Sequence, residues 1–183
     1  MDHYIDVLIL PDPEFSAAIL MNSLYNKLHK ALWDRKSTTI GVSFPQYNVT
    51  LGDLLRVHGS VTDLTGLQEK NWIGGMSGYC TASDIMKVPE STKFRTVSRK
   101  QPTMSQSKLN RLKKRGSISE DEIKQYKAKM FSKGLEDPYV ELVSGSNSHK
   151  HRRYIEFGEL QDNPDFGVFD LFGLSKMATV PWF

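Results

Sequence analysis

In this sequence of 183 residues, the side chain best suited to acid–base chemistry is that of His29. Leucines recur every four residues from Leu20 to Leu32, so His29 lies at the edge of the apolar face of a helix that Ser16 could cap. A partly buried imidazole there could take a proton from a ribose 2′-hydroxyl, because its ordinary pKa lies near neutrality. A histidine at a helix edge is more often a packing or surface residue, so both interpretations stay open.

Basic residues are concentrated in one part of the chain. Between Arg95 and Lys133 there are twelve lysines and arginines against three acidic residues, whereas the rest of the chain holds twelve basic and eighteen acidic residues. An acidic body with a basic segment indicates a polyanion site confined to one region. A solvated surface helix is the alternative.

The centre of this segment is predicted to be a basic helix over Lys108–Arg115. Spacings of three and four residues place Lys108, Arg111 and Arg115 on one face, with Lys114 beside them. Such a helix suits the deep, narrow major groove of RNA, which it would recognise by shape and charge. We therefore expect RNA binding, with Leu109 and Leu112 packing the helix lightly on the body.

Two further groups have side chains suited to RNA contacts. Arg99 and Gln101 have the donor forks that read a purine edge, although they could equally end an ordinary polar strand. The loop Ser144–Ser148 offers small side chains that could bind a phosphate or a 2′-hydroxyl, although such loops are usually connectors.

The sequence offers little for other chemistries. Cys80 is the only cysteine, no two histidines have zinc-site spacing, and no HExxH, P-loop or GxGxxG motif is present, so no metal or cofactor is expected. No apolar run approaches the roughly 18–20 residues of a membrane span, and no signal peptide is recognisable, so a cytoplasmic protein without membrane contact is expected.

The first half of the chain predicts the order β-α-β-β-α-β. This is the ferredoxin-like pattern, so we expect an α+β protein. The segments behind it are a strand over Tyr4–Leu10, the helix after Ser16, strands over 41–44 and Asp53–His58, a helix over Asp63–Lys70 and a strand within Tyr79–Val88.

A second small α/β domain is predicted after a boundary at residue 93, giving domains 1–93 and 94–183. Phe94–Lys100 is expected to be an extended arm, and the polar segment 102–106 a linker to the basic helix. Gly116 is expected to end that helix, and the capping box Ser119–Glu122 to begin another. Two strands, over Tyr139–Val143 and Arg153–Phe157, should follow.

Several motifs together resemble one known family, the CRISPR repeat-processing endoribonuclease of type I-F systems. The similarity runs essentially from end to end, and its most specific parts are the beginning and the ending. The motifs are Met1-Asp2-His3-Tyr4, Pro11-Asp12-Pro13-Glu14-Phe15, Lys27-Leu28-His29, Ile40–Pro45, Val97-Ser98-Arg99 with Gln101, Gly173-Leu174-Ser175-Lys176 and Val180-Pro181-Trp182-Phe183.

The resemblance implies an enzyme that binds the stem-loop of CRISPR repeat RNA and cuts once at the 3′ base of the stem, without metal. The 2′-hydroxyl attacks the phosphate, leaving a 2′,3′-cyclic phosphate and a 5′-hydroxyl. The mature crRNA stays bound, so the enzyme becomes a subunit of the type I-F surveillance complex with other subunits as partners. The alternatives are a crRNA-binding assembly subunit with weak or no cleavage, and a DNA-binding or general basic adaptor.

The resemblance also assigns roles to residues. His29 matches the proton acceptor and Ser144 the residue that holds the attacking 2′-hydroxyl, while Ser146 and Asn147 match phosphate and ribose contacts. By the same resemblance, Arg99 and Gln101 read purines low in the stem, and Lys108–Arg115 is the major-groove helix.

Three departures from the family pattern are visible. Phe172 stands where the family has a tyrosine near the active site, so any role of that hydroxyl is absent. His151 stands where an aromatic residue stacks on the terminal base pair. The basic helix has Asn110, Lys113 and Lys114 at positions where arginines are usual, which weakens bidentate phosphate contacts.

Overall fold

The first half of the chain forms one antiparallel sheet. The structure is a computed structural model that describes residues 1–100, 106–133, 137–143 and 150–183. The sheet has the order β2-β3-β1-β4, and the short β5 also pairs with β1. The bounds are β1 His3–Ile9, α1 Ala17–Arg35, β2 Gly41–Ser43, β3 Leu54–Gly59, α2 Val61–Gln68, β4 Cys80–Ala82 and β5 Met86–Lys87, with a 3-10 turn at Gly74–Met76.

This sheet confirms the predicted ferredoxin-like pattern. The elements follow in the order β1, α1, β2, β3, α2, β4, and β1 lies between β3 and β4, antiparallel to both. Ser16 occupies the N-cap position of α1, but its side chain makes no capping hydrogen bond. In α2 the cap is made: the Ser60 side chain accepts a hydrogen bond from the Asp63 backbone N–H at 3.1 Å.

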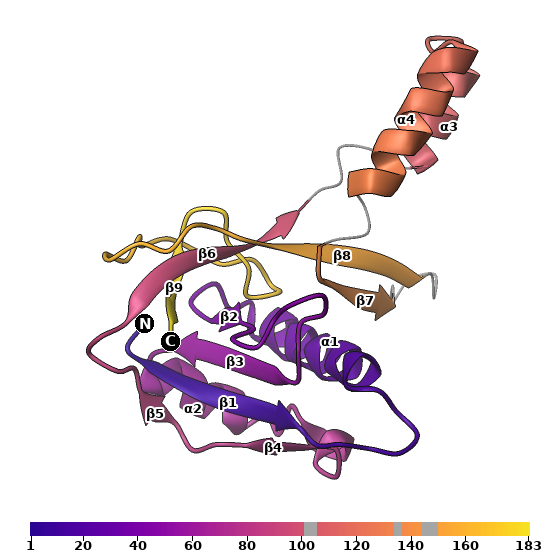
Figure 1. Ribbon diagram of the computed structural model, residues 1–183. Coiled ribbons are helices and arrows are strands. Elements are labelled where there is room, and N and C mark those ends of the chain that lie inside the picture. The colour runs from indigo at the N-terminus through magenta and orange to yellow at the C-terminus, as the bar shows by residue number, and fades with distance from the viewer. Residues whose placement is uncertain (101–105, 134–136, 144–149) are drawn as a thin grey trace.

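A second antiparallel sheet, of order β7-β8-β6-β9, covers the first half (Figure 1). Its strands are β6 Lys93–Lys100, β7 Tyr139–Val143, β8 Lys150–Phe157 and β9 Thr179–Trp182. The segment expected as an extended arm is therefore the central strand β6. Its first half pairs with β9 and its second half with β8, both from the far end of the chain.

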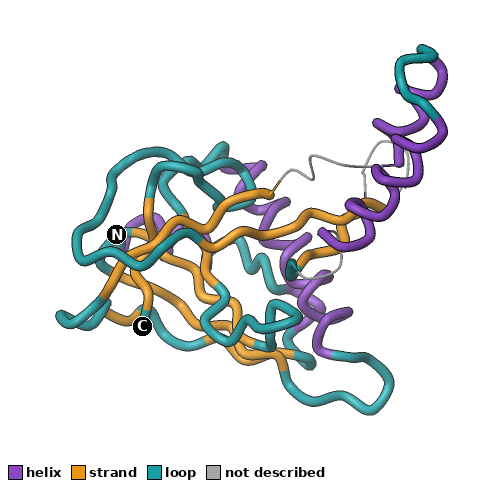
Figure 2. The backbone as a smooth tube through the Cα atoms, turned by 45° about the horizontal axis from the view of Figure 1, so that its top comes forward, coloured by secondary structure: helices purple, strands orange, loops and turns teal. Residues whose placement is uncertain are grey.

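Helix α1 lies between the two sheets (Figure 1), and Figure 2 shows the backbone tilted so that the top of that view comes forward. Its buried residues include Leu24 and Leu28, which belong to the same hydrophobic cluster as Val57 of β3 and Ile155 of β8. One core therefore serves both sheets. The division into domains 1–93 and 94–183 stays a proposal. The strands before residue 93 belong to the first sheet, and those from residue 93 onward to the second, but one hydrophobic core joins the two sheets.

The basic segment forms a helical hairpin that projects from the body (Figure 1). Its helices are α3 Gln106–Lys114 and α4 Glu120–Lys133. Gly116 has a positive φ of 62°, and the Ser117 N–H donates to Leu112 O at 3.2 Å, as expected of a glycine that ends a helix. The predicted capping box is also confirmed, since the Ser119 N–H donates to the Glu122 carboxylate at 2.8 Å.

Packing of the hairpin differs from expectation. Leu109 is fully buried, but neither Leu109 nor Leu112 belongs to the cluster of buried residues that joins the two sheets. Tyr126 of the same hairpin is also buried and is likewise outside that cluster. No described helix is long and apolar enough to cross a membrane.

Candidate active site

His29 lies on α1 where the helix passes below the second sheet. Its Nδ1 is 2.8 Å from the carbonyl oxygen of Leu171. Because a carbonyl oxygen can only accept, Nδ1 carries the proton and donates it to Leu171. In the neutral ring, Nε2 therefore holds a lone pair, and no described residue forms a hydrogen bond with it. The ring is half-buried, so this nitrogen can act as a proton acceptor.

The surroundings of His29 favour its neutral form. Burial is the main cause of a pKa below the ordinary histidine value, and the positive charge of Arg153 acts in the same direction. The hydrogen bond to Leu171 and the carboxylate of Asp170 oppose the shift without cancelling it. At neutral pH the imidazole is therefore largely uncharged.

The phenyl ring of Phe172 covers one face of the imidazole. The two ring centroids are 3.5 Å apart and the planes are inclined by 12°. The Cζ atom of Arg153 is also 3.5 Å from the Phe172 centroid. Because the imidazole fills one face of the phenyl ring at contact distance, the guanidinium must lie over the other face. Imidazole, phenyl ring and guanidinium form a three-layer stack.

The segment that carries Phe172 is tightly fixed. The Asp170 carboxylate accepts hydrogen bonds from the backbone N–H groups of Phe172 at 2.9 Å and Leu174 at 3.0 Å. The Tyr25 hydroxyl donates to Phe172 O at 2.8 Å. Gly173 has a φ of 72°, and a Cβ there would come within 2.8 Å of Val42 Cγ1, so only glycine fits this turn.

An asparagine on α1 fixes the helix against the second sheet. Asn22 Oδ1 accepts a hydrogen bond from the Glu141 backbone N–H of edge strand β7 at 2.8 Å. This bond occupies a donor on the open edge of the sheet and sets the helix in register with β7 and β8. His29, seven residues further along the same helix, is thereby placed below β8.

Arg153, Arg99 and His151 lie on the face of the second sheet that turns toward α1. Leu142 pairs with His151 and Val140 with Arg153, and both apolar partners are buried. Arg99 pairs with Ile155, which is also buried, so it shares that face and adds to the positive charge around Arg153. Arg99 and His151 are exposed, and Arg99 lines an open pocket of about 620 Å³.

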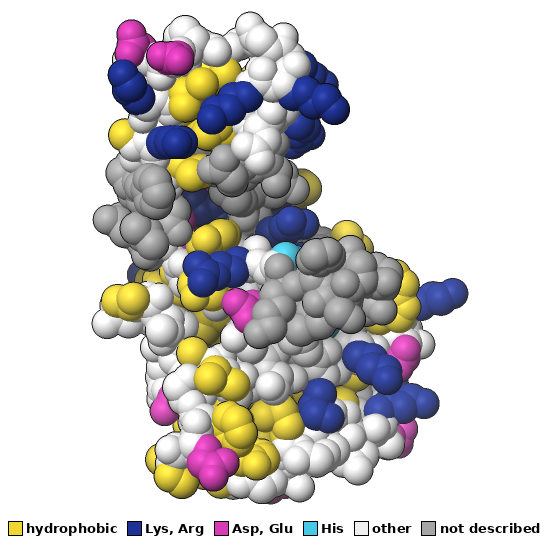
Figure 3. All heavy atoms as spheres, turned by 90° about the vertical axis from the view of Figure 1, so that its right-hand side faces the viewer, with side chains coloured by type: hydrophobic (Ala, Val, Ile, Leu, Met, Phe, Trp, Pro, Cys, Tyr) yellow, Lys and Arg dark blue, Asp and Glu magenta, His cyan; other side chains and the backbone are white. Residues whose placement is uncertain are grey.

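The structure brings His29, Phe172 and Arg99 to one region, with Arg153 between them. Four of the predicted site residues lie outside the described residues: Gln101, Ser144, Ser146 and Asn147. The four basic residues singled out in this segment are on the projecting hairpin, three on α3 and Arg115 directly after it, and all of them are exposed: Lys108, Arg111, Lys114 and Arg115. Figure 3 shows lysine and arginine side chains gathered on this part of the surface.

Residues 4–183 match the model of the family described as CRISPR-associated protein (Cas_Csy4). The chain belongs to this family. A relative from Escherichia coli (strain UTI89 / UPEC), named CRISPR-associated endonuclease Cas6/Csy4, is 39% identical over 184 residues and covers 100% of both chains. A relative of the same name from Pseudomonas aeruginosa (strain UCBPP-PA14) is 38% identical over 187 residues, again with 100% of each chain covered.

Among solved structures, the CRISPR endoribonuclease Cse3 bound to a 19-nucleotide RNA is a distant likeness. The identity is 12%, the coverage is 99% of this chain and 100% of the other, and the TM-score is 0.34. The full-length match to Cas_Csy4 therefore confirms the resemblance that the terminal motifs indicate, without any help from this structural likeness.

Sequence reasoning missed three residues at the site of this Cas_Csy4 protein. Arg153 supplies the guanidinium of the stack, Asp170 holds its loop and Tyr25 anchors Phe172. A signal for Arg153 existed, because strand residues two apart share a face and Ile155 had to point inward. Nothing in the sequence indicated that Tyr25 would reach a carbonyl oxygen 147 residues away.

A serine and a histidine are paired in the first sheet. Ser43 Oγ and His58 Nε2 are 2.8 Å apart, and both side chains are buried. Burial holds the pKa of His58 well below its ordinary value, with Arg56 adding to the effect. This pair is out of reach of any substrate, so we assign it to packing.

Proposed function

We propose that this Cas_Csy4 protein is an endoribonuclease that processes CRISPR repeat RNA with His29 as the proton acceptor. The observation that carries the proposal is the hydrogen bond from His29 Nδ1 to Leu171 O, which leaves the lone pair on Nε2. Membership of the family, and two relatives named CRISPR-associated endonucleases at 38–39% identity, support the reaction class.

The proposed reaction needs no group beyond RNA and this chain. His29 Nε2 removes the proton of a ribose 2′-hydroxyl, and the oxygen attacks the adjacent phosphorus. The bond from phosphorus to the 5′-oxygen breaks, and that oxygen takes up a proton from solvent, to which the protonated His29 returns the one that it removed. The products are a 2′,3′-cyclic phosphate and a 5′-hydroxyl. Ser144 is proposed to hold the attacking hydroxyl, as the resemblance implies.

Substrate binding is proposed to use a different part of the molecule. The exposed basic residues of α3 would contact phosphates in the major groove of the repeat hairpin, and Arg99, near the stack, would read a purine. The hairpin would then stay bound after cleavage, which makes the protein a subunit of a larger type I-F complex.

A catalytically weak assembly subunit is the second candidate, because Phe172 has no hydroxyl. The stacking of Phe172 on His29 argues against it. The ring holds the imidazole by contact, so the proton acceptor is still oriented without that hydroxyl.

The test is cleavage of a labelled repeat hairpin in excess EDTA. We expect one cut at the 3′ base of the stem and a cyclic phosphate end, because the reaction uses an imidazole and not a metal ion. His29→Ala should reduce the single-turnover rate by at least about 10³-fold, and the hairpin should bind as before. Tight binding without any cut by the wild type would instead support the assembly subunit.

If His29→Ala loses both the binding of the RNA hairpin and its cleavage, His29 has a structural role. Duplex DNA is the matched competitor. Equal affinity for DNA and for the RNA hairpin would contradict the proposed substrate and favour a general basic adaptor.

A further inference from the structure

Arg153 has unusual surroundings for a buried cation. Its side chain is 10% exposed, and its Nε atom is buried without a hydrogen-bond partner among the described residues. Among the described residues, Arg153 forms one ion pair, in which its Nη1 lies 3.6 Å from Asp170 Oδ2. A buried arginine ordinarily donates to several acceptors, but no described residue accepts a hydrogen bond from this Nε.

The contact that fixes Arg153 is the face of Phe172. Its Cζ lies 3.5 Å from the ring centroid, and His29 lies against the opposite face. A guanidinium is attracted to the negative face of an aromatic ring, and the attraction grows when both groups are removed from water. The contact therefore fixes the phenyl ring between the guanidinium and the imidazole.

We propose that Arg153 is a positioning residue for His29: through Phe172 it holds the imidazole in place and keeps it uncharged before the reaction. This proposal rests on the proposed function, because it concerns the residue assigned as proton acceptor. The resemblance to the family assigns no role to Arg153.

Charge repulsion across the stack supplies the second part of the effect. Two separations of 3.5 Å place the guanidinium roughly 7 Å from the imidazole. A protonated His29 would face another cation through one phenyl ring, whereas a neutral imidazole would not. Arg153 thus disfavours the protonated ring, which has no lone pair on Nε2 and cannot accept a proton.

Other charged groups near the stack do not remove this repulsion. Asp170 attracts both cations, but its side chain is 46% exposed and therefore screened by water. Arg99, on the same sheet face, adds positive charge beside Arg153. The pKa of His29 lies below its ordinary value, with Arg153 among the causes after burial.

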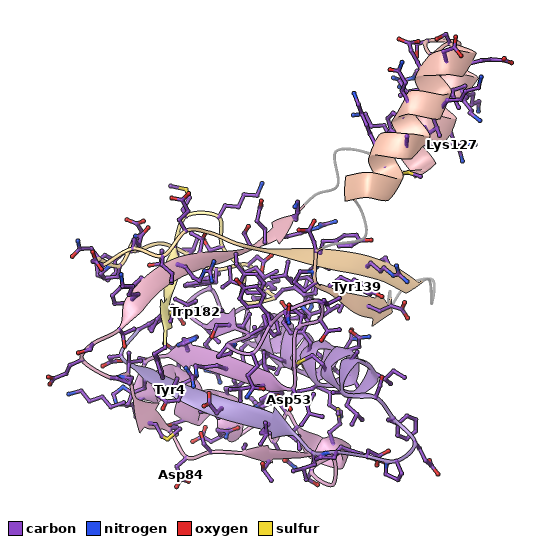
Figure 4. The ribbon with its side chains drawn as sticks, in the orientation of Figure 1. Tyr4, Asp53, Asp84, Lys127, Tyr139 and Trp182 are labelled. Atoms are coloured by element: carbon purple, nitrogen blue, oxygen red, sulfur yellow. The ribbon has the colours of Figure 1, made fainter. Side chains whose placement is uncertain are left out.

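The neighbouring residue provides a matched control. Arg152 lies on the opposite face of β8, with its Cζ 4.4 Å from the ring centroid of Tyr139. Figure 4 labels Tyr139 on β7. Arg152→Met and Arg153→Met each remove one positive charge from the same strand, but only the second removes a layer of the stack.

The direct measurement is the titration of His29 in the RNA-free protein, followed by NMR of isotope-labelled histidine. We expect Arg153→Met to move the midpoint upward by about 0.5 pH unit and Arg152→Met by less than about 0.1. Arg153→Gln, which keeps a planar end without the charge, should also shift the midpoint upward and serves if the methionine variant does not fold. No shift, or equal shifts in Arg152→Met and Arg153→Met, would overturn the proposal.

Cleavage provides the second measurement. In single-turnover reactions with saturating RNA hairpin, the acid limb of the pH–rate profile should move to higher pH in Arg153→Met. At pH values on the acid side of that limb, the rate should be roughly threefold slower than in the wild type. Arg153→Lys restores the charge and should return the limb toward the wild-type position. If no variant cuts RNA, the proposed function fails, but the NMR titration still decides the role of Arg153.

Discussion

Two histidines of this chain have pKa values below the ordinary range, and their surroundings give them different tasks. His29 is half-buried, is oriented by Leu171 and Phe172, and keeps one nitrogen for a proton. His58 is fully buried beside Ser43, and its Nδ1 has no hydrogen-bond partner among the described residues. A depressed pKa alone therefore does not identify a proton acceptor, and it is orientation combined with access that makes His29, not His58, the proposed one.

The buried His58 should make stability depend on pH. Its folded pKa is lowered, so below its ordinary value of 6.5 the unfolded chain binds a proton that the folded protein does not. Stability is therefore retained above that pH and lost as the pH falls. We expect the free energy of unfolding to decrease from pH 6.5 to pH 5 by up to about 1.4 kcal/mol per pH unit from this residue.

Urea unfolding at several pH values measures this slope, and His58→Gln is the variant to compare. Glutamine can still bond to Ser43 but does not titrate, so the slope of the variant should be flatter than that of the wild type. Parallel slopes would show that His58 does not cause the acid sensitivity.

At the scale of elements, the position of His29 depends on how α1 meets the edge of the second sheet. Asn22 binds the Glu141 N–H at 2.8 Å, whereas Asn26, one turn later, reaches the Glu141 carbonyl oxygen at 3.5 Å. The first bond is short and its acceptor comes from the helix. The second is at the limit of a hydrogen bond, and Asn26 also bonds to its own helix at Asn22 O.

Asn22→Ala should therefore destabilise the protein more than Asn26→Ala. Removal of the Asn22 amide takes an acceptor from a half-buried N–H, which costs about 1–2 kcal/mol of unfolding free energy. Asn26→Ala should cost less than about 0.5 kcal/mol, because its bond across the interface is long. Equal losses in denaturant unfolding would mean that Asn22 does not dock the helix in this way.

Local patterns in the sequence predict some elements well and others not at all. The leucine spacing from Leu20 to Leu32 predicts α1, and Ser119 with Glu122 predicts the start of α4. The central place of β6 was missed, because its partners Thr179–Trp182 and Lys150–Phe157 are more than fifty residues away and leave no local signal. The stack on His29 was missed for the same reason, since its members come from α1, β8 and the C-terminal loop.

At the scale of the whole molecule, the proposed proton acceptor and the proposed RNA contacts lie in separate parts. The stack lies between the two sheets, whereas the basic residues of α3 project away on the hairpin (Figures 1 and 3). Under the proposed function, changes on α3 should alter how tightly RNA binds without altering the rate of the step at His29.

Salt dependence tests this separation. Arg111 is exposed on α3 and Arg115 is exposed directly after its end. Each phosphate contact contributes about one unit to the slope of log K against log salt. The double variant Arg111→Ala with Arg115→Ala should lower the magnitude of that slope by about two and should weaken binding of the RNA hairpin most at low salt. The single-turnover cleavage rate at saturating RNA should stay within about twofold of the wild type, because neither residue reaches His29.

Lys124→Ala with Lys127→Ala is the matched control, because it removes two exposed charges from α4 of the same hairpin; Figure 4 labels Lys127 there. Charges that do not contact phosphate release no counterions, so this pair should change the slope by less than about 0.5. If both double variants change the slope equally, the helical hairpin attracts RNA through its overall positive charge and α3 does not bind a groove. A large fall in the cleavage rate of the α3 pair would mean that the hairpin also places the scissile phosphate at His29.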